Sequence, residues 1–133
     1  MKVKKVQLEP FFKVLRGTDG VLSLADARVR DAFMKPLGNH LDAFYADRAK
    51  IYESFSIKDK EGNPDLTDGN FHFPADEMEN LNGELIEFGE EIVEVEFVWG
   101  VTGGKLKEII EKSTYKPVYG ETEVIDEIIN NIN

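Results

Sequence analysis

The sequence predicts an α+β fold, with two packed antiparallel helices, a β-hairpin between them, a small antiparallel sheet and short C-terminal helices. Two stretches have apolar residues at the spacing of one helix face. The first comprises Leu37, Leu41, Phe44, Ile51 and Phe55, and the second comprises Met78, Leu81, Leu85 and Phe88. A third stretch, residues 93–99, alternates with the period of a strand. With 133 residues the chain is near the usual size of one domain, so residues 1–133 are expected to share one core.

The opening residues predict a short strand that reaches Leu8. Val3, Val6 and Leu8 are apolar among lysines. Pro10 has no backbone N–H and is therefore expected to end the strand. Residues 11–15 then have room for one or two helical turns before a turn at residues 17–20.

Ser23 and Asp26 predict the start of the first long helix, because the hydroxyl can accept from a free amide and the carboxylate lies near the positive end of the helix dipole. Pro36 removes one helical hydrogen bond, so we expect a kink or break near Lys35, and two helical pieces are an alternative to one helix. Arg48 interrupts the apolar stripe. Its stem is expected to cover apolar surface with the guanidinium in water, and pairing with an acid is the alternative.

Two turn-forming clusters, residues 58–65 and 67–70, predict a small β-hairpin or an ordered loop that ends at residues 71–73. Pro74 and the acids after it predict the start of the second helix, for which Gly89 is the expected cap. The simplest packing places the two apolar stripes against each other.

The strand at residues 93–99 is expected to pair with the N-terminal strand and to place Lys2, Lys4 and Lys5 opposite glutamates.

Beyond this strand, residues 103–104 are expected to form a glycine hinge or turn before a short helix with Leu106, Ile109 and Ile110. Residues 114–133 either dock on the body or form an appended segment. That segment is expected to have an extended part at 115–120 and an amphipathic helix at 124–132.

The net charge of −10 is unevenly distributed along the chain. Residues 1–50 contain ten Lys and Arg against six acids, whereas residues 51–133 contain six against twenty. The candidate acidic interaction surface comprises Asp59, Glu61, Asp65, Asp68, Asp76, Glu77, Glu79, Glu84, Glu87, Glu90, Glu91, Glu94 and Glu96. Such a surface repels phosphates and attracts basic surfaces, so we expect no direct binding to nucleic acid or membranes. The alternative is a solvated face that only confers solubility.

The sequence predicts no catalytic, cofactor-binding or metal-binding residues, and hence a protein that is not an enzyme. There are no cysteines. His40 and His72 lie on different predicted elements without a second ligand or nucleophile at a telling spacing. The common catalytic motifs are missing. Residues 59–68 combine acids with glycine, but Pro64 and the order of the acids do not fit a calcium loop, which leaves a weak divalent site as the alternative to an acidic turn.

No apolar run approaches the length of a membrane span, and the basic residues at the start are not followed by a signal peptide's apolar stretch.

Several short motifs in the middle of the chain occur in a characteristic order. They are Leu41-Asp42-Ala43-Phe44-Tyr45-Ala46-Asp47-Arg48, Tyr52-Glu53, Lys58-Asp59-Lys60-Glu61-Gly62-Asn63, Phe71-His72-Phe73, Asn82-Gly83-Glu84-Leu85 and Glu90-Glu91-Ile92-Val93-Glu94-Val95. This order resembles a family of small, uncharacterised proteins encoded by tailed phages and prophages. The resemblance spans roughly residues 1–112, and Trp99 and residues 114–133 do not match it. It implies a phage setting, and it transfers no activity and no functional residue.

In that setting, the expected function is that of a non-enzymatic phage accessory protein that acts by protein–protein binding, as a virion structural or assembly component of the head, neck or tail. The alternative is an acidic mimic of nucleic acid that inhibits a host defence or nucleic-acid-handling protein. It would require carboxylates along one surface at phosphate-like spacing. The expected partner is thus a phage structural protein or a host protein, and a homo-oligomer is left open. The expected location is the host cell cytoplasm, with the virion as the alternative.

Overall fold

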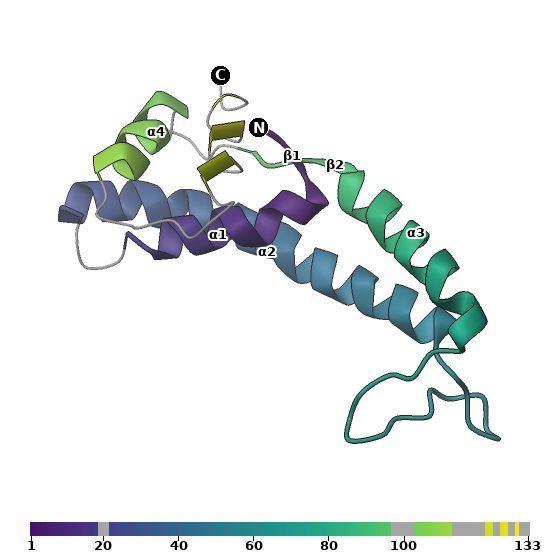
Figure 1. Cartoon of the computed structure of the whole chain (residues 1–133). Coiled ribbons are helices and arrows are strands. Elements are labelled where there is room, and N and C mark those ends of the chain that lie inside the picture. Colours follow the sequence, from purple (N-terminus) through teal and green to yellow (C-terminus); the bar gives the residue numbers. More distant parts are fainter. Residues whose placement is uncertain (19–21, 97–102, 113–121, 124–125, 128–129, 131–133) are drawn as a thin grey trace.

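The computed structural model describes residues 1–18, 22–96, 103–112, 122–123, 126–127 and 130. Its elements are β1 (Lys2–Lys4), a 3-10 turn (Lys5–Gln7), α1 (Leu8–Arg16), α2 (Leu24–Phe55), a second 3-10 turn (Ala75–Glu77), α3 (Met78–Glu90), β2 (Ile92–Glu94) and α4 (Gly103–Lys112). The fold is mostly helical with a small two-stranded antiparallel sheet, which confirms the α+β class. In Figure 1, α2 is the spine against which α1, α3 and α4 pack, and α3 runs back antiparallel to it.

The N-terminal strand is shorter than predicted, and the helix after it is longer. β1 ends at Lys4, and α1 begins at Leu8, which is fully buried in the core. Pro10 therefore lies in the first turn of α1 instead of ending a strand. Proline fits there because the first N–H groups of a helix have no partner within it.

α2 is one continuous helix, which confirms the one-helix alternative and excludes a division into two pieces near Lys35. The Ser23 hydroxyl accepts from the Asp26 amide at 3.2 Å, which confirms the predicted start. Pro36 lies inside the helix between Phe33 and Leu37, both fully buried. Their burial holds both adjacent turns on the core and offsets the backbone hydrogen bond that Pro36 cannot make.

Residues 56–74 form an ordered loop, and the predicted hairpin is wrong. Only two isolated bridges form in this loop, Lys58–Pro64 and Thr67–Asn70. A carboxylate oxygen of Asp59 accepts from the amides of Glu61 and Asn63, and this local turn competes with a strand ladder.

An aromatic cluster fixes the returning end of the loop on α2. The rings of Tyr52, Phe71 and Phe73 lie 6.0 to 6.4 Å apart between centroids. Beyond this cluster the loop projects past the ends of α2 and α3 (Figure 1).

α3 packs on α2 through part of its predicted stripe. Leu81 and Phe88 are buried, and the Phe88 ring stacks on Phe44 with centroids 5.4 Å apart, whereas Met78 is exposed. Gly89 is not a cap, because it is a buried residue inside the helix. A Cβ at this position would lie 3.2 Å from the Cβ of Val6, so the glycine permits a close approach of the N-terminal segment.

The predicted pairing of the two strands is confirmed. Val3 lies opposite Val93 in an antiparallel register. Lys4 forms an ion pair with Glu90 at 2.8 Å, and Lys5 pairs with Glu91. The part of the predicted strand from residue 97 to 99 lies outside the described residues.

One core joins all these elements. It consists of Met1, Val3, Leu8, Phe11, Leu15, Phe33, Leu37, Leu41, Phe44, Phe88, Val95 and Leu106. The Arg48 guanidinium lies over the rings of Phe44 and Tyr45, 5.1 Å from each centroid. This cation–π contact differs from both expectations for Arg48, since its head group is neither directed only to water nor paired with an acid among the described residues.

The predicted helix after the glycine pair is α4, and Gly103 and Gly104 are its first residues instead of a separate hinge. Leu106 and Ile109 are fully buried. Residues 122–123, 126–127 and 130 are helical and exposed. The predicted extended part at 115–120 and the remaining positions of the terminal helix lie outside the described residues.

An ion pair between α2 and α4 gives a pH-dependent contact. The Lys105 ammonium lies 2.9 Å from a carboxylate oxygen of Asp26. The hydrogen bond with Lys105 lowers the pKa of Asp26, and the same bond raises the pKa of Lys105. Asp26 stabilises the folded state above the pKa that it has in the unfolded chain, and this stabilisation is lost as the pH falls through its lower folded pKa. Lys105 stabilises the folded state below the pKa that it has in the unfolded chain, and this stabilisation is lost as the pH rises through its higher folded pKa.

We therefore expect amide protection in α4 to fall both below about pH 4 and above about pH 10. Asp26→Asn should reduce α4 protection at neutral pH and make the acid limb of the dependence smaller, with the remainder coming from Glu108, whose pKa is lowered by Lys112 and Lys105. Hydrogen exchange followed by mass spectrometry measures this, with Glu111→Gln as the control on α4. An unchanged acid limb in Asp26→Asn would contradict the assignment.

Candidate protein-binding face

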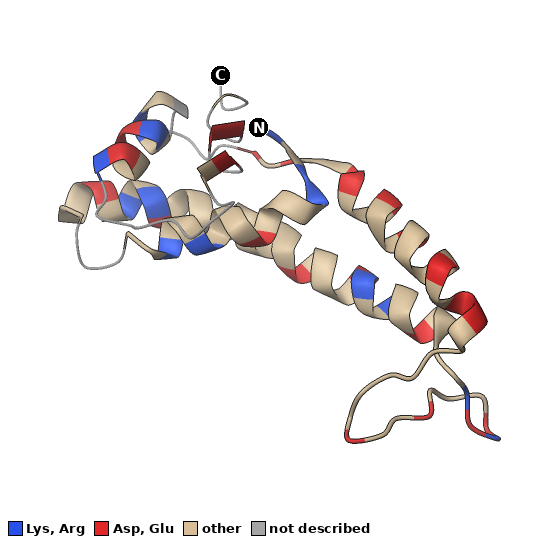
Figure 2. Ribbon diagram, in the orientation of Figure 1, with Lys and Arg blue, Asp and Glu red and all other residues tan. Residues whose placement is uncertain are grey.

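The predicted acidic residues gather on one projecting part of the molecule. We call residues 56–90, which form the loop, the second 3-10 turn and α3, the acidic arm. In Figure 2 the ribbon is red at the positions of these acids, which follow α3 and the loop at one end of the molecule. The arm contains ten of the thirteen predicted acids and only two lysines. The other three, Glu91, Glu94 and Glu96, continue from the end of α3 into β2 and beyond.

Five of the thirteen carboxylates have partners within the chain. Glu90, Glu91 and Glu94 pair with Lys4, Lys5 and the N-terminal amine respectively. Asp59 closes the turn in the loop, and Glu77 accepts from the amide group of Asn80 at 3.3 Å. These five contribute to the fold.

The other eight carboxylates have no hydrogen bond or ion pair in the described part of the chain. They are Glu61, Asp65, Asp68, Asp76, Glu79, Glu84, Glu87 and Glu96, and all are exposed. On α3, Glu79 and Glu87 lie on the face opposite the buried Leu81, about two helical turns apart. The arm thus presents several unpaired negative charges to solvent.

The negative charge is unfavourable for α3 itself. Glu84, Glu87 and Glu90 are spaced by three residues, so like charges are neighbours on the helix surface. The last turn of α3 has no basic residue, although the negative end of the helix dipole favours cations there. The like-charge spacing and the uncompensated C-terminal end therefore reduce the stability of α3.

We expect Glu87→Gln to stabilise the protein by roughly 0.3–1 kcal/mol, because it removes a like-charge neighbour and a negative charge from the C-terminal half of α3. Glu79→Gln is the matched control in the first turn, where an acid is favourable, so it should destabilise by a similar amount. Urea denaturation measures both changes. If both variants changed the free energy of unfolding in the same direction, the argument from the helix dipole would be wrong.

The arm also exposes apolar side chains between the acids. Ile57, Leu66 and Ile86 are 42%, 50% and 67% exposed. Val6 and Ile92, next to the end of α3, are exposed as well. Apolar side chains interleaved with charge can add contact area where a partner protein binds. Sequence reasoning missed them, although Ile86 is visible as an isoleucine outside the buried stripe.

A shallow groove of about 730 Å³ lies where α3 meets the end of α2. Its lining includes Phe55, Gly83 and three glutamates, Glu79, Glu84 and Glu87. A Cβ at Gly83 would meet nothing within 4 Å, so packing does not require glycine there. The groove therefore combines an aromatic wall, bare helix backbone and negative charge, which suit the stem and head group of a lysine or arginine.

The side chains that could bind a metal ion do not gather in the described part of the chain. The described residues contain no group of three or more His, Asp or Glu side chains arranged to hold a metal ion. His40 is half-buried on α2, and His72 is exposed in the loop, so the fold does not bring them together on one element. The described site therefore offers charge and apolar contact.

The chain matches no family model, no curated protein and no solved structure at a significant level.

In the described ranges, no helix combines the length and the apolar character needed to cross a bilayer, and the 32 residues of α2 include many charged side chains.

Proposed function

We propose that this protein is a non-enzymatic binding protein whose acidic arm attaches to a basic surface of another protein. The observation that carries this proposal is the set of unpaired carboxylates on the projecting arm, which are interleaved with exposed apolar side chains. Charge complementarity would steer the partner and set its register, and the apolar side chains would add contact area. In the phage setting implied by the resemblance, we propose that the partner is a component of the head, neck or tail, or a factor in its assembly.

A second candidate is a mimic of nucleic acid that blocks a host defence or nucleic-acid-handling protein. The unpaired glutamates on α3 favour it, because negative charge on an exposed helix can occupy a phosphate-binding surface. The exposed Ile57, Leu66 and Ile86 favour the first candidate, because apolar side chains add contact area to a protein–protein interface but do not imitate a phosphate. We therefore rank structural or assembly binding first.

The test is a pull-down from phage-infected or induced cells with the tagged full chain, washed at low and at high salt. Recovery of head, neck or tail proteins that survives high salt supports assembly binding. A host DNA- or RNA-binding protein lost at about 1 M salt, where the screening length falls to about 3 Å, supports the mimic. Recovery of the tagged protein alone contradicts both.

A pair of variants assigns the partner to the arm. We expect Glu84→Gln with Glu87→Gln to reduce partner recovery at least about tenfold, since each lost charged contact is worth roughly 1–3 kcal/mol. The control, Asp47→Asn with Glu111→Gln, removes the same charge from α2 and α4 and should leave recovery unchanged. Equal recovery with both double variants would place the binding surface elsewhere.

A further inference from the structure

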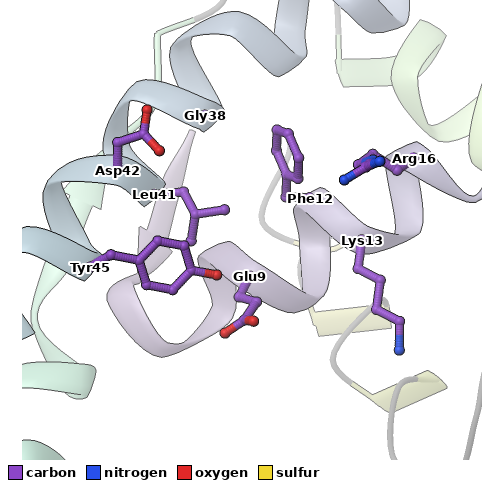
Figure 3. Close-up of a pocket in the computed structure, with 8 residues that line it drawn as sticks. All are labelled: Glu9, Phe12, Lys13, Arg16, Gly38, Leu41, Asp42 and Tyr45. Atoms are coloured by element: carbon purple, nitrogen blue, oxygen red, sulfur yellow. The ribbon is translucent and has the colours of Figure 1, made fainter. Parts of the chain in front are cut away.

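A second hollow, separate from the acidic arm, lies between α1 and the middle of α2 (Figure 3). We call it the α1–α2 cleft. Its volume is about 530 Å³, within the range of sites that hold small molecules. Phe12 and Arg16 line it from α1, and Gly38, Leu41 and Asp42 line it from α2.

The floor of the cleft is apolar. Gly38 has no side chain to fill the space, and a Cβ there would lie 3.4 Å from Cε2 of Phe12. Leu41 is buried and belongs to the core, while Phe12 is half-buried and packs against it. The apolar body of a ligand would therefore lie on side chains that the fold already holds in place.

Opposite charges stand on the two walls. Arg16 comes from α1 and Asp42 from α2, and in Figure 3 the Phe12 ring is drawn between them. Neither side chain has an ion pair or hydrogen bond in the described part of the chain, and both are exposed at the cleft. Lys13 adds a second positive charge on the α1 wall. The cleft thus offers positive charge on the α1 wall and the Asp42 carboxylate on the α2 wall.

The other acid of the cleft is already engaged. The Glu9 carboxylate faces the Tyr45 hydroxyl across the cleft (Figure 3), and burial, followed by this carboxylate, raises the pKa of Tyr45. The Tyr45 ring is also held by Arg48, whose guanidinium lies 5.1 Å from its centroid. The Tyr45 side chain is therefore held in place before a ligand binds, and Asp42 is the carboxylate that remains available to a ligand.

We propose that the α1–α2 cleft binds a zwitterion of short-peptide size, with its carboxylate on Arg16, its ammonium on Asp42 and an apolar side chain on Phe12 and Leu41. A guanidinium matches a carboxylate with two parallel hydrogen bonds. A ligand with one charge would leave the opposite wall without a partner, so both ends contribute to recognition. The volume exceeds that of one amino acid, which favours a peptide of two or three residues.

The test uses the dipeptide leucyl-leucine, followed in ¹H–¹⁵N spectra of the full chain. We expect saturable shifts at the amides of Phe12, Gly38 and Asp42, with millimolar affinity. N-acetylated and C-amidated forms of the dipeptide each lack one charge and should bind about tenfold more weakly. No shift at about 10 mM peptide, or equal binding of the capped forms, would overturn the proposal.

Variants separate the cleft from the rest of the surface. Arg16→Gln and Asp42→Asn should each weaken the free dipeptide about tenfold, and Asp42→Asn should not weaken the N-acetylated form further. The controls are Arg28→Gln and Asp47→Asn, which remove like charges from α2 outside the cleft. Unchanged spectra away from the cleft show that each variant is folded. Full binding by Asp42→Asn would contradict the ammonium contact.

Discussion

Leu37→Ala is expected to lower the free energy of unfolding by about 3–5 kcal/mol, the range for a fully buried leucine whose cavity cannot collapse. Leu37 has no exposed surface and belongs to the core that joins α1, α2 and α3. Its loss should also weaken α2 locally, because Leu37 follows Pro36 and helps to hold the turn that lacks a backbone hydrogen bond.

Leu24→Ala is the matched control, because it makes the same chemical change on the same helix at a leucine that is 68% exposed. It should cost no more than about 0.5 kcal/mol. Urea denaturation measures both values, and hydrogen exchange shows whether the amides around Pro36 lose protection in Leu37→Ala. Similar losses for the two variants would mean that the core is not where the structure places it.

The predictions from the sequence were most accurate where a periodic apolar pattern is compatible with only one structure. The stripe from Leu37 to Phe44 is buried, and Val3 pairs with Val93, because apolar spacing directly reports which face of an element meets the core. The start of α2 at Ser23 was also predictable, since it depends on a local hydrogen bond.

The predictions were wrong or left open where a proline or glycine is compatible with two local structures, and tertiary contacts determine which of the two forms. Pro10 can end a strand or open a helix, and the burial of Leu8 decides for the helix. Pro36 can divide a helix or be tolerated, and the burial of Phe33 and Leu37 decides for tolerance. Gly89 has the composition of a cap, but the approach of Val6 gives it another role.

The acidic arm could be predicted as a list of residues but not as a surface. The count of acids between residues 59 and 96 follows from the sequence. Which of them are engaged depends on the N-terminal segment, because Lys4 and Lys5 reach Glu90 and Glu91 from the other end of the chain. The α1–α2 cleft was not predicted, because its walls come from two helices and each charge looks like ordinary surface in the sequence.

Arg30 is the one charged side chain among the buried residues of α2, and no sequence pattern marks it. Its Nη1 donates to the hydroxyl of Thr18 at 3.0 Å, and Nε and Nη2 donate to one carboxylate oxygen of Asp31 at 3.0 and 2.9 Å. Thr18 has no exposed surface, and its hydroxyl donates to the Leu15 carbonyl. Arg30 therefore ties Thr18, just beyond the end of α1, to α2.

We expect Arg30→Ala to cost about 2–3 kcal/mol, because it removes a charged hydrogen bond to a buried partner and the packing of a long stem. Thr18→Val keeps the shape of Thr18 but removes the acceptor, and should cost about 1–2 kcal/mol. The double variant should cost less than the sum of the two, because both single changes break the same bond.

Arg28→Ala is the control on an exposed turn of the same helix, and it should remain within about 0.5 kcal/mol of the unmodified chain. Additive costs for Arg30→Ala and Thr18→Val would show that the two side chains stabilise the protein independently. If Arg30→Ala loses about the full 2–3 kcal/mol of unfolding free energy while the amides of α1 keep their protection in hydrogen exchange, Arg30 acts through packing alone. Coupled costs together with early opening of α1 would establish that this buried hydrogen bond closes the α1 end of the core.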